Sequence, residues 1–422
     1  MTPPLRADLV IRNASVAATP AEPTLGGEIL QRIPHAAMAG RDGRIVWIGP
    51  EHDLPASLLA ASPQVLDAGG GVLMPGFIDP HTHAVFSGWR EQDFVRRLQG
   101  HGYADIAAAG GGIATTVRAT RAAREEDLAA SLLERLDRML ALGVTTVEVK
   151  SGYGLDLEAE LRQLRAISAA ARAHPVRLVP TFMGAHAVPP EYRDRRQAYI
   201  DLVTQQMLPA VAAEGLATFC DVFVDTGAFT LQEGRQILAA ARDLGLQGKV
   251  HADELTSCGG AELAAEMGAV SAEHLLHASD AGIAAMAAAG VVAVLLPATS
   301  FLLRETPAQA ERFRQAGCAI AVGTDFNPGS SPCEALPLAA AMGCIGNGLT
   351  PDEAIVGITA SAAAATGLAT ETGSLRPGMS MDVVVLDAPD PVHLVYRFGA
   401  NLVRDVVARG RIAVRDGALM AR

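Results

Sequence analysis

Two histidines in the stretch "PGFIDPHTHAVFSGWRE" (75–91) have the type and spacing of metal ligands. His81 and His83 follow an apolar run, 72–78, that is typical of a buried strand. Side chains two apart on an extended chain point to the same face, so both imidazoles would leave the strand end side by side. Imidazole is the commonest protein ligand for metals. The pair alone also fits a strand-end turn, so the metal assignment depends on further ligands.

Two more candidate ligands occur far along the chain. His251 lies in "HADE" and Asp325 in "GTDFNPGSSP". Taken alone, Asp325 is equally typical of a turn. Three imidazoles and one carboxylate match zinc, whose catalytic sites leave one position open for water. A metal so held lowers the pKa of its water from 15.7 to about 7. We predict one divalent metal per chain, with Zn²⁺ as the first choice and iron as the alternative.

Two groups beside these ligands could move protons. Glu254 follows His251 by three residues. It is either a solvated loop carboxylate or the base that takes the proton from the attacking water and returns it to the leaving nitrogen. His274 could hydrogen-bond the water or the developing oxyanion, and its alternative is a core histidine with ordinary partners. We predict catalytic roles for both.

The elements that must position these residues are short β-branched runs alternating with Ala-rich helical segments, which is typical of a parallel α/β fold. Eight such runs match a (β/α)8 TIM barrel, whose active site lies at the C-terminal strand ends. The candidate residues fall at those ends. The runs are 71–79, 144–150, 176–184, 220–225, 249–254, 270–275, 291–297 and 319–325.

Both ends of the chain have a different texture, with strand-like runs separated by glycine turns. Each end alone has too few strands for a stable sheet. We therefore predict a small composite β-sandwich from residues 1–70 and 373–422, around a metal-dependent barrel over residues 71–372.

The amino-acid composition argues against some classes of binding partner and bears on the cellular location. The net charge of −12, from 34 basic and 46 acidic residues, argues against nucleic acid or an anionic membrane. No apolar run reaches the ~18 residues of a membrane span, and no secretory signal is visible. Five scattered cysteines without CxxC spacing favour reduced thiols and a cytoplasmic location.

At this point the sequence resembles the amidohydrolase superfamily. The resemblance rests on "PGFIDPHTHAVFSGWRE", "GGGIATTVRATR", "VEVKSGYGLD", "TFMGAHAVPPEY", "HADEL", "GGAELAAEMGAVSAEHL" and "GTDFNPGSSP". It is closest to the members that hydrolyse 4-imidazolone-5-propanoate to N-formimidoyl-L-glutamate, the third step of histidine degradation. It implies a small-molecule substrate and a homodimer. It also implies substrate contacts at Arg90, Tyr153, His186, Glu254, Asn327, Gly329 and Ser330.

Two residues qualify the resemblance. Trp89 stands beside Arg90 where a small residue is common. Two-metal relatives bridge their metals with a modified lysine on strand four, whereas Lys150 ends strand two, so one metal is expected. We expect Lys150 to pair with a carboxylate inside the barrel.

Two other functions remain open from the sequence. A deaminase of a heterocycle such as guanine or cytosine would use the same metal and Glu254, but it would not require the anion-binding Arg90. A non-catalytic scaffold on this fold would be expected to lack some of the four ligands, and all four are present.

Overall fold

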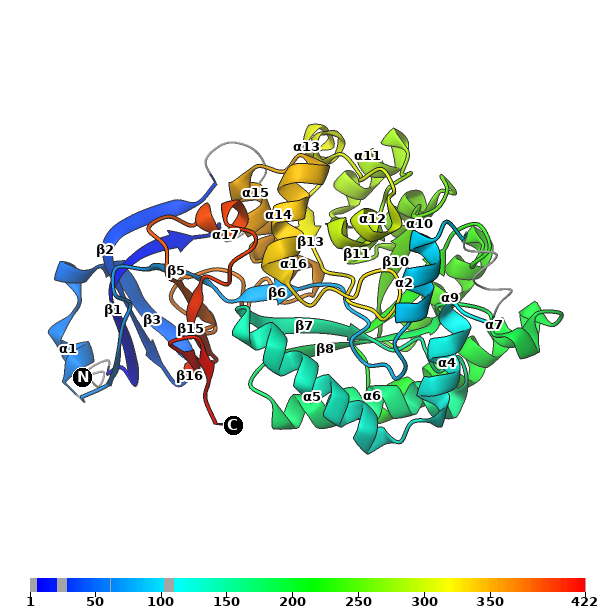
Figure 1. Ribbon diagram of the computed structural model, residues 1–422, viewed down its shortest axis with the longest axis horizontal. Helices are drawn as coiled ribbons and strands as arrows, with labels where there is room; N and C mark the ends of the chain where they lie inside the picture. Colours follow the sequence, from blue (N-terminus) through cyan, green and yellow to red (C-terminus); the bar gives the residue numbers. More distant parts are fainter. Residues whose placement is uncertain (1–5, 21–28, 61, 102–109, 422) are drawn as a thin grey trace.

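The computed structural model describes residues 6–20, 29–60, 62–101 and 110–421, which form a barrel domain and a sheet domain side by side (Figure 1). Eight parallel strands make the barrel, in the order β13-β12-β11-β10-β9-β8-β7-β6. An isolated parallel bridge between Thr82 and Phe326 joins its two outermost strands. The predicted (β/α)8 barrel is confirmed. Its strands are β6 (Phe77–Asp79), β7 (Val144–Lys150), β8 (Arg177–Ala185), β9 (Phe219–Val224), β10 (Gln247–Ala252), β11 (Ser271–His274), β12 (Val292–Leu295) and β13 (Ile320–Val322).

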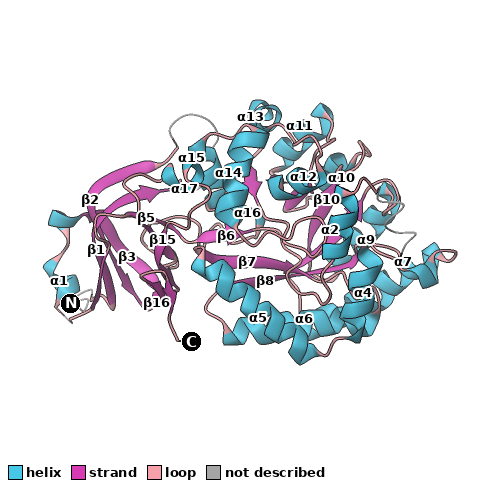
Figure 2. Cartoon of the chain, in the orientation of Figure 1, coloured by secondary structure: helices cyan, strands magenta, loops and turns pink. Residues whose placement is uncertain are grey.

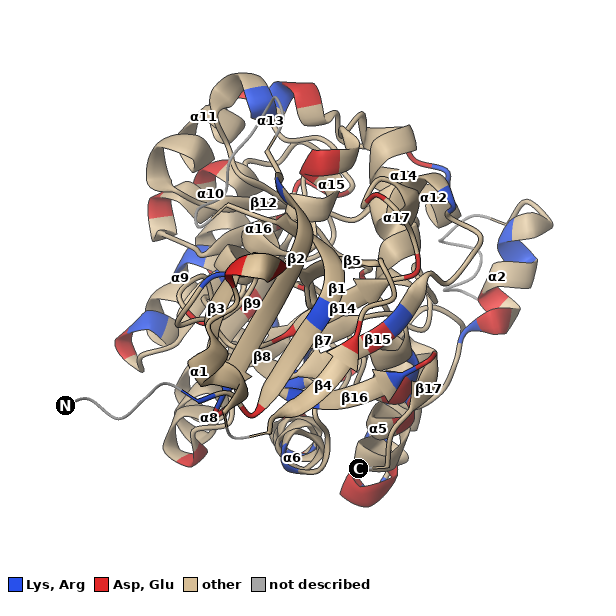
Figure 3. Ribbon diagram, turned by 90° about the vertical axis from the view of Figure 1, so that its left-hand side faces the viewer, with Lys and Arg blue, Asp and Glu red and all other residues tan. Residues whose placement is uncertain are grey.

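Helices surround these strands (Figure 2). In α5 (Glu125–Ala141), Leu128, Leu132 and Leu136 recur at every fourth position and are buried toward the barrel. Acidic and basic residues both occupy the outer helices, as on α5 and α13 (Figure 3). The remaining barrel helices are α2 (Glu91–Leu98), α4 (Ile113–Ala122), α6 (Leu157–Ala173), α7 (Arg196–Leu202), α8 (Leu208–Glu214), α9 (Leu231–Asp243), α10 (Gly260–Met267), α11 (Asp280–Ala289), α12 (Pro297–Leu303), α13 (Ala310–Ala316), α14 (Leu336–Asn347), α15 (Pro351–Gly357) and α16 (Ala360–Ala365). None of the described helices is both long and apolar enough to cross a membrane.

The second domain is one mixed sheet of nine strands drawn from both ends of the chain. The two ends meet where β14 runs antiparallel to β5, with Val383 opposite Pro75. The edge strand that contains Ile45 lies against the segment just before β14, because Ile45 N donates to Met379 O and Gly378 N donates to Ile45 O. The strands are β1 (Leu9–Ala18), β2 (Gln31–Arg41), β3 (Arg44–Pro50), β4 (Gln64–Asp67), β5 (Val72–Pro75), β14 (Val383–Leu386), β15 (Val403–Ala408), β16 (Arg411–Arg415) and β17 (Ala418–Leu419). Two short helices, α1 (Ala56–Leu59) and α17 (His393–Tyr396), lie outside the barrel.

The run 71–79 corrects one prediction, because it is two strands and not one. Residues of β5 pair within the mixed sheet, whereas β6 is the first barrel strand. The break falls at Gly76, where an added Cβ would lie 2.2 Å from Thr145 Oγ1. The apolar pattern is continuous across the break because both strands are fully buried, so hydrophobicity alone carries no boundary signal.

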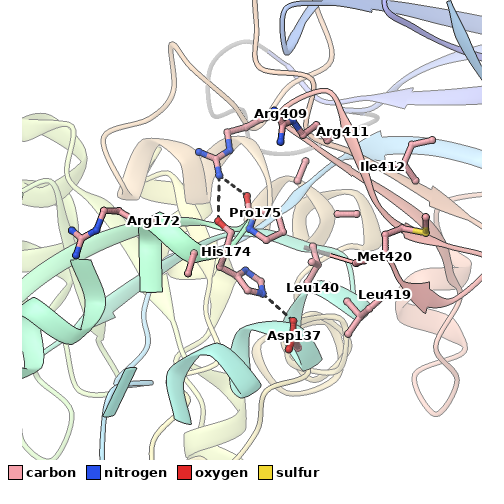
Figure 4. A pocket seen from close by; sticks show the side chains of 14 residues that line it. Asp137, Leu140, Arg172, His174, Pro175, Arg409, Arg411, Ile412, Leu419 and Met420 are labelled. Atoms are coloured by element: carbon pink, nitrogen blue, oxygen red, sulfur yellow. Dashed lines mark hydrogen bonds and ion pairs between the residues drawn. The ribbon is translucent and has the colours of Figure 1, made fainter. Parts of the chain in front are cut away.

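The domains also meet at the N-terminal ends of the barrel strands, around a pocket of about 510 Å³. Arg409, in the turn between β15 and β16, donates from Nη2 to the carbonyl oxygens of His174 at 3.4 Å and Pro175 at 3.0 Å (Figure 4). Its backbone N–H donates to Asp382 Oδ1 at 2.7 Å. One arginine therefore links the C-terminal hairpin to the barrel, on the face opposite the C-terminal strand ends.

Candidate active site

Four candidate ligands converge at the C-terminal ends of β6, β10 and β13. His81 and His83 follow β6, His251 lies on β10, and Asp325 follows β13. All four are at most 3% exposed. Asp325 Oδ1 lies 3.4 Å from His81 Nε2 and 3.5 Å from His83 Nε2, and the Nε2 atoms of His83 and His251 are 3.4 Å apart. The structure thus brings together residues that are 244 positions apart in sequence.

The distances among these ligand atoms fit a metal ion with tetrahedral coordination. Ligand atoms ~2.1 Å from a common centre lie roughly 3.3–3.4 Å from one another, which matches the separations among His81, His83, His251 and Asp325. Among the described residues, both ring nitrogens of His81 and Nδ1 of His83 are buried without a hydrogen-bond partner. Burial lowers the pKa of both imidazoles well below the usual value, which keeps them in the neutral form that a metal requires.

Asp325 reaches the cluster through an unusual backbone conformation. Its φ is 52°, in the left-handed region, where aspartate is among the few residues tolerated. Its N–H donates to His81 O at 3.1 Å, and Thr299 Oγ1 donates to its Oδ2 at 2.6 Å. Burial raises the carboxyl pKa to about 6. Strained backbone conformations of this kind occur most often at active sites and ligand-binding sites.

A buried chain of hydrogen-bonded charged side chains orients His251. Asp221 Oδ1 accepts from His251 Nδ1 at 3.0 Å, which leaves Nε2 to face the other ligands. Lys150 Nζ donates to Asp221 Oδ2 and to Glu148 Oε1, each at 2.7 Å. The expected pairing of Lys150 with a carboxylate is therefore confirmed. Burial raises the pKa of Asp221, but His251 and Lys150 outweigh burial and hold it well below its usual range.

Glu254 and His274 lie together beside the ligand cluster. Glu254 Oε2 is 3.5 Å from His274 Nε2. Burial, with the nearby charge of Asp325, raises the pKa of Glu254 to about 8. The loop is held by Asp253, whose carboxylate accepts from backbone N–H groups of 258–261 at 2.8–3.2 Å. His274 has a φ of 70°, a second strained backbone in the site.

Aromatic residues form one wall. The ring of His186, after β8, stacks on His83 with centroids 4.9 Å apart, and Tyr153 lies 5.8 Å from His83. His186 Nδ1 is 3.0 Å from Gly152 O, and burial lowers the pKa of His186 to about 3. Burial also raises the pKa of Tyr153, so both side chains are neutral near pH 7 and lie beside the candidate ligands.

Arg90 lies across the loop that follows Asp325. A Cβ added to Gly329 would lie 1.7 Å from Arg90 Nη2, so any larger residue at this position would displace the guanidinium. Arg90 N donates to Pro328 O at 3.2 Å, and Arg90 Nε is buried without a partner among the described residues. An unpaired buried donor on a cation is suited to an anionic group of a ligand.

The side chain of Asn327 makes hydrogen bonds within the loop that follows Asp325. Its Nδ2 donates to Asp325 O at 2.6 Å and Ser330 Oγ at 2.8 Å, and its Oδ1 accepts from Gly329 N and Ser330 N, both at 2.8 Å. These four bonds use the full capacity of an amide side chain. The amide therefore holds the loop that follows Asp325, and the substrate contacts implied at Asn327, Gly329 and Ser330 stay predictions.

Sequence reasoning missed Asp221 and Thr299 as residues that support the site. Asp221 had a readable signal, since a charged residue in the buried strand "CDVFVD" needs a partner. Thr299 had none, because it lies on a short helix whose pattern is ordinary.

Comparison with known proteins agrees with this geometry. Residues 104–414 match the model of the Amidohydrolase family, so the chain is an amidohydrolase. It is 52% identical to the imidazolonepropionase of Symbiobacterium thermophilum over 98% of this chain and 99% of the relative. It is 49% identical to that of Myxococcus xanthus over 97% and 98%. The chain belongs to the imidazolonepropionases, which are hydrolases acting on the C–N bond of a cyclic amide.

Solved structures share the fold at low identity. A triazine hydrolase variant matches with a TM-score of 0.75 and 15% identity, over 98% of this chain and 96% of that one. An adenosine deaminase from Xanthomonas campestris with bound zinc matches with a TM-score of 0.70 and 18% identity, over 100% and 96%. At these identities the likeness extends to the fold alone.

Proposed function

We propose that this chain hydrolyses 4-imidazolone-5-propanoate to N-formimidoyl-L-glutamate, with the residue roles that follow. The observation that carries the proposal is the joint placement of a four-ligand cluster, the Glu254 carboxyl group and the partly buried Arg90. The substrate offers a matching pair of groups, a ring amide for the cluster and a propionate for the guanidinium. Family membership at about half identity supports this reading over others.

We assign the metal ligands as His81, His83, His251 and Asp325. Three nitrogen donors and one oxygen donor suit Zn²⁺, and iron is the alternative. When bound, the metal supplies Lewis-acid chemistry, which acidifies water and polarises a carbonyl oxygen. Lys150 is held by two carboxylates within β7 and β9, which supports one metal per chain rather than a lysine-bridged pair.

Glu254 is the proton carrier in this proposal. Its carboxylate removes a proton from the water that attacks the ring carbonyl carbon. The ring C–N bond then breaks, and Glu254 returns the proton to the departing nitrogen. His274, 3.5 Å from Glu254, donates a hydrogen bond to the oxyanion that develops on the carbonyl oxygen. A carboxyl pKa raised by burial suits an acid–base group that both takes and gives a proton near neutral pH.

Substrate orientation falls to the opposite side of the site. Arg90 binds the propionate carboxylate through its planar fork. Tyr153 and His186 flank the ring, and Ser330 lies in the loop beside Arg90. In this proposal Gly329 leaves room for the guanidinium, which lies where a Cβ on this residue would stand.

The test compares wild type with Arg90→Ala on two compounds, 4-imidazolone-5-propanoate and the same ring without the propionate. Charge-assisted hydrogen bonds contribute ~1.5–3 kcal/mol, so kcat/KM for the first compound should fall ~10- to 150-fold. The loss on the second should be much smaller. Product identification must show N-formimidoyl-L-glutamate, and equal losses on both compounds would remove the carboxylate role from Arg90.

The deaminase alternative is not favoured. Two fold neighbours, an adenosine deaminase and a 5-methylcytosine deaminase, share only 18% and 17% identity with this chain. Efficient release of ammonia from guanine or cytosine by the wild type would restore that alternative.

We also propose a cytoplasmic homodimer. The five cysteines are unbonded, as in reducing compartments. Phe301, Ile345 and Tyr396 are 71%, 76% and 75% exposed on α12, α14 and α17, and α14 packs against the other two helices. Such a surface suits an apolar interface. Analytical ultracentrifugation of the wild type and of Ile345→Glu tests this proposal, and the variant should sediment as a monomer. If both proteins form dimers with the same dissociation constant, this surface is not the dimer interface.

A further inference from the structure

The segment between the metal ligand His83 and the proposed carboxylate receptor Arg90 is irregular backbone, and side chains of three helices hold it. Each of the five carbonyl oxygens from Ala84 to Gly88 accepts a side-chain hydrogen bond. The donors are Arg135 to Ala84 and Phe86, Gln163 to Val85, Thr120 to Ser87 and Thr116 to Gly88. We call residues 84–90 the receptor arm.

Arg135 makes the strongest of these contacts. Its Nη1 lies 2.6 Å from Ala84 O and 3.1 Å from Phe86 O, and its Cζ lies 3.7 Å from the Phe86 ring centroid. The Trp89 ring, next to Arg90, is 5.5 Å away. The guanidinium therefore contacts the receptor arm through two carbonyl oxygens and the face of the Phe86 ring.

Arg135 is a buried cation without a direct counter-ion. The residue is 5% exposed, and within the described ranges no carboxylate lies at ion-pair distance from it. Burial lowers its pKa to about 10, which still leaves it charged at neutral pH. A buried charge of this kind is costly unless carbonyl and ring contacts compensate it. An apolar side chain at this position would leave the carbonyl oxygens of Ala84 and Phe86 without these donors, so the guanidinium is what holds this part of the arm.

We propose that Arg135 is a positioning residue that fixes the receptor arm so that Arg90 meets the substrate carboxylate. This inference rests on the proposed role of Arg90. A displacement of about 1 Å at a contact can cost ~10²-fold, and the arm has no regular secondary structure of its own to resist such a displacement.

The test measures KM and kcat of Arg135→Met and Arg135→Lys on the propionate-bearing substrate and on the same ring lacking it. Arg135→Met should raise KM for the first compound ~10- to 100-fold, with kcat, metal content and activity on the second compound nearly unchanged. Arg135→Lys keeps the charge but not the fork, so it should recover part of the loss and serves if the methionine variant does not fold. The matched control is Arg138→Met, one turn further along α5, whose guanidinium pairs with Glu334 at 2.6 Å outside the arm. It should match the wild type.

A double-mutant cycle separates this inference from the proposed function. Because Arg135 acts through Arg90, adding Arg135→Met to Arg90→Ala should change KM less than about 2-fold. If Arg90→Ala fails to discriminate the two compounds, the proposed function of Arg90 is wrong. If Arg90→Ala discriminates but both Arg135 variants behave like wild type, or lose equally on both compounds, or lose metal, the positioning role of Arg135 is overturned.

Discussion

Replacing Asp221 by Asn should weaken the metal site without touching a ligand. In the wild type, one carboxylate oxygen of Asp221 accepts from His251 Nδ1 at 3.0 Å and the other from Lys150 Nζ at 2.7 Å. An amide cannot satisfy both donors. If its oxygen faces His251, its NH2 group meets the lysine ammonium. If it flips, it forces the proton of His251 onto Nε2, the atom that we assign to the metal.

The size of the effect follows from the bond that is lost. A hydrogen bond to a charged group contributes ~1.5–3 kcal/mol, or ~10- to 150-fold in affinity at ~1.4 kcal/mol per decade. Outer contacts of this type typically change metal affinity 10- to 100-fold. We expect Asp221→Asn to lose metal to a chelator at a concentration ~10- to 100-fold lower than the wild type does.

The assay titrates metal-loaded protein with chelator and measures the bound metal directly. The matched control is Glu353→Gln, a buried carboxylate on α15 that accepts from Arg314 Nε and Nη2, each at 2.8 Å, and lies outside the ligand cluster. It should lower the melting temperature while keeping metal affinity. If Asp221→Asn retains metal as the wild type does, or if Glu353→Gln loses metal equally, the orientation of His251 is refuted as the cause.

Four further predictions concern the site and the fold. Elemental analysis should find one metal per wild-type chain and none in Asp325→Ala. Two tightly bound metals in the wild type, or unchanged metal content in the variant, would contradict a mononuclear site. Glu254→Gln should lower turnover ~10²-fold or more while metal persists, and near-normal turnover would remove its role. Because only the carboxylate form of Glu254 can take the proton, kcat/KM of the wild type should rise as the pH passes through the pKa of Glu254. This rise should be absent in Glu254→Gln. Deleting residues 383–422 should unfold the N-terminal strands as well, as hydrogen exchange would show; a soluble, active truncated protein would argue against a shared sheet.

The sequence was most informative where chemistry and position coincide. His81, His83 and Asp325 could be predicted because each follows an apolar strand, and parallel strands in a closed barrel bring their C-terminal ends to one face. The pairing of Lys150 could be predicted because a charged residue inside a buried strand must find a partner. In each case the local pattern determines the environment of the side chain.

The remainder depends on contacts between distant segments. The break at Gly76 is set by Thr145, which packs against it, and no periodicity marks it. The loop-holding role of Asn327 follows from the exact path of 325–331, where its own neighbours use its whole amide. Arg135 looks like one more charged residue of an amphipathic helix until the receptor arm is seen beneath it.

The interleaved sheet has a consequence for how the protein is made. β5 ends at Pro75, and its partner β14 begins at Val383, so a ribosome adding ~5–20 residues per second needs ~15–60 s to deliver the missing neighbour. During that interval the newly made N-terminal strands expose an unpaired edge, which is prone to association with other chains. The first part of the chain to be synthesised is therefore among the last to reach its native pairing, and the yield of folded protein should depend on how long chaperones shield that edge.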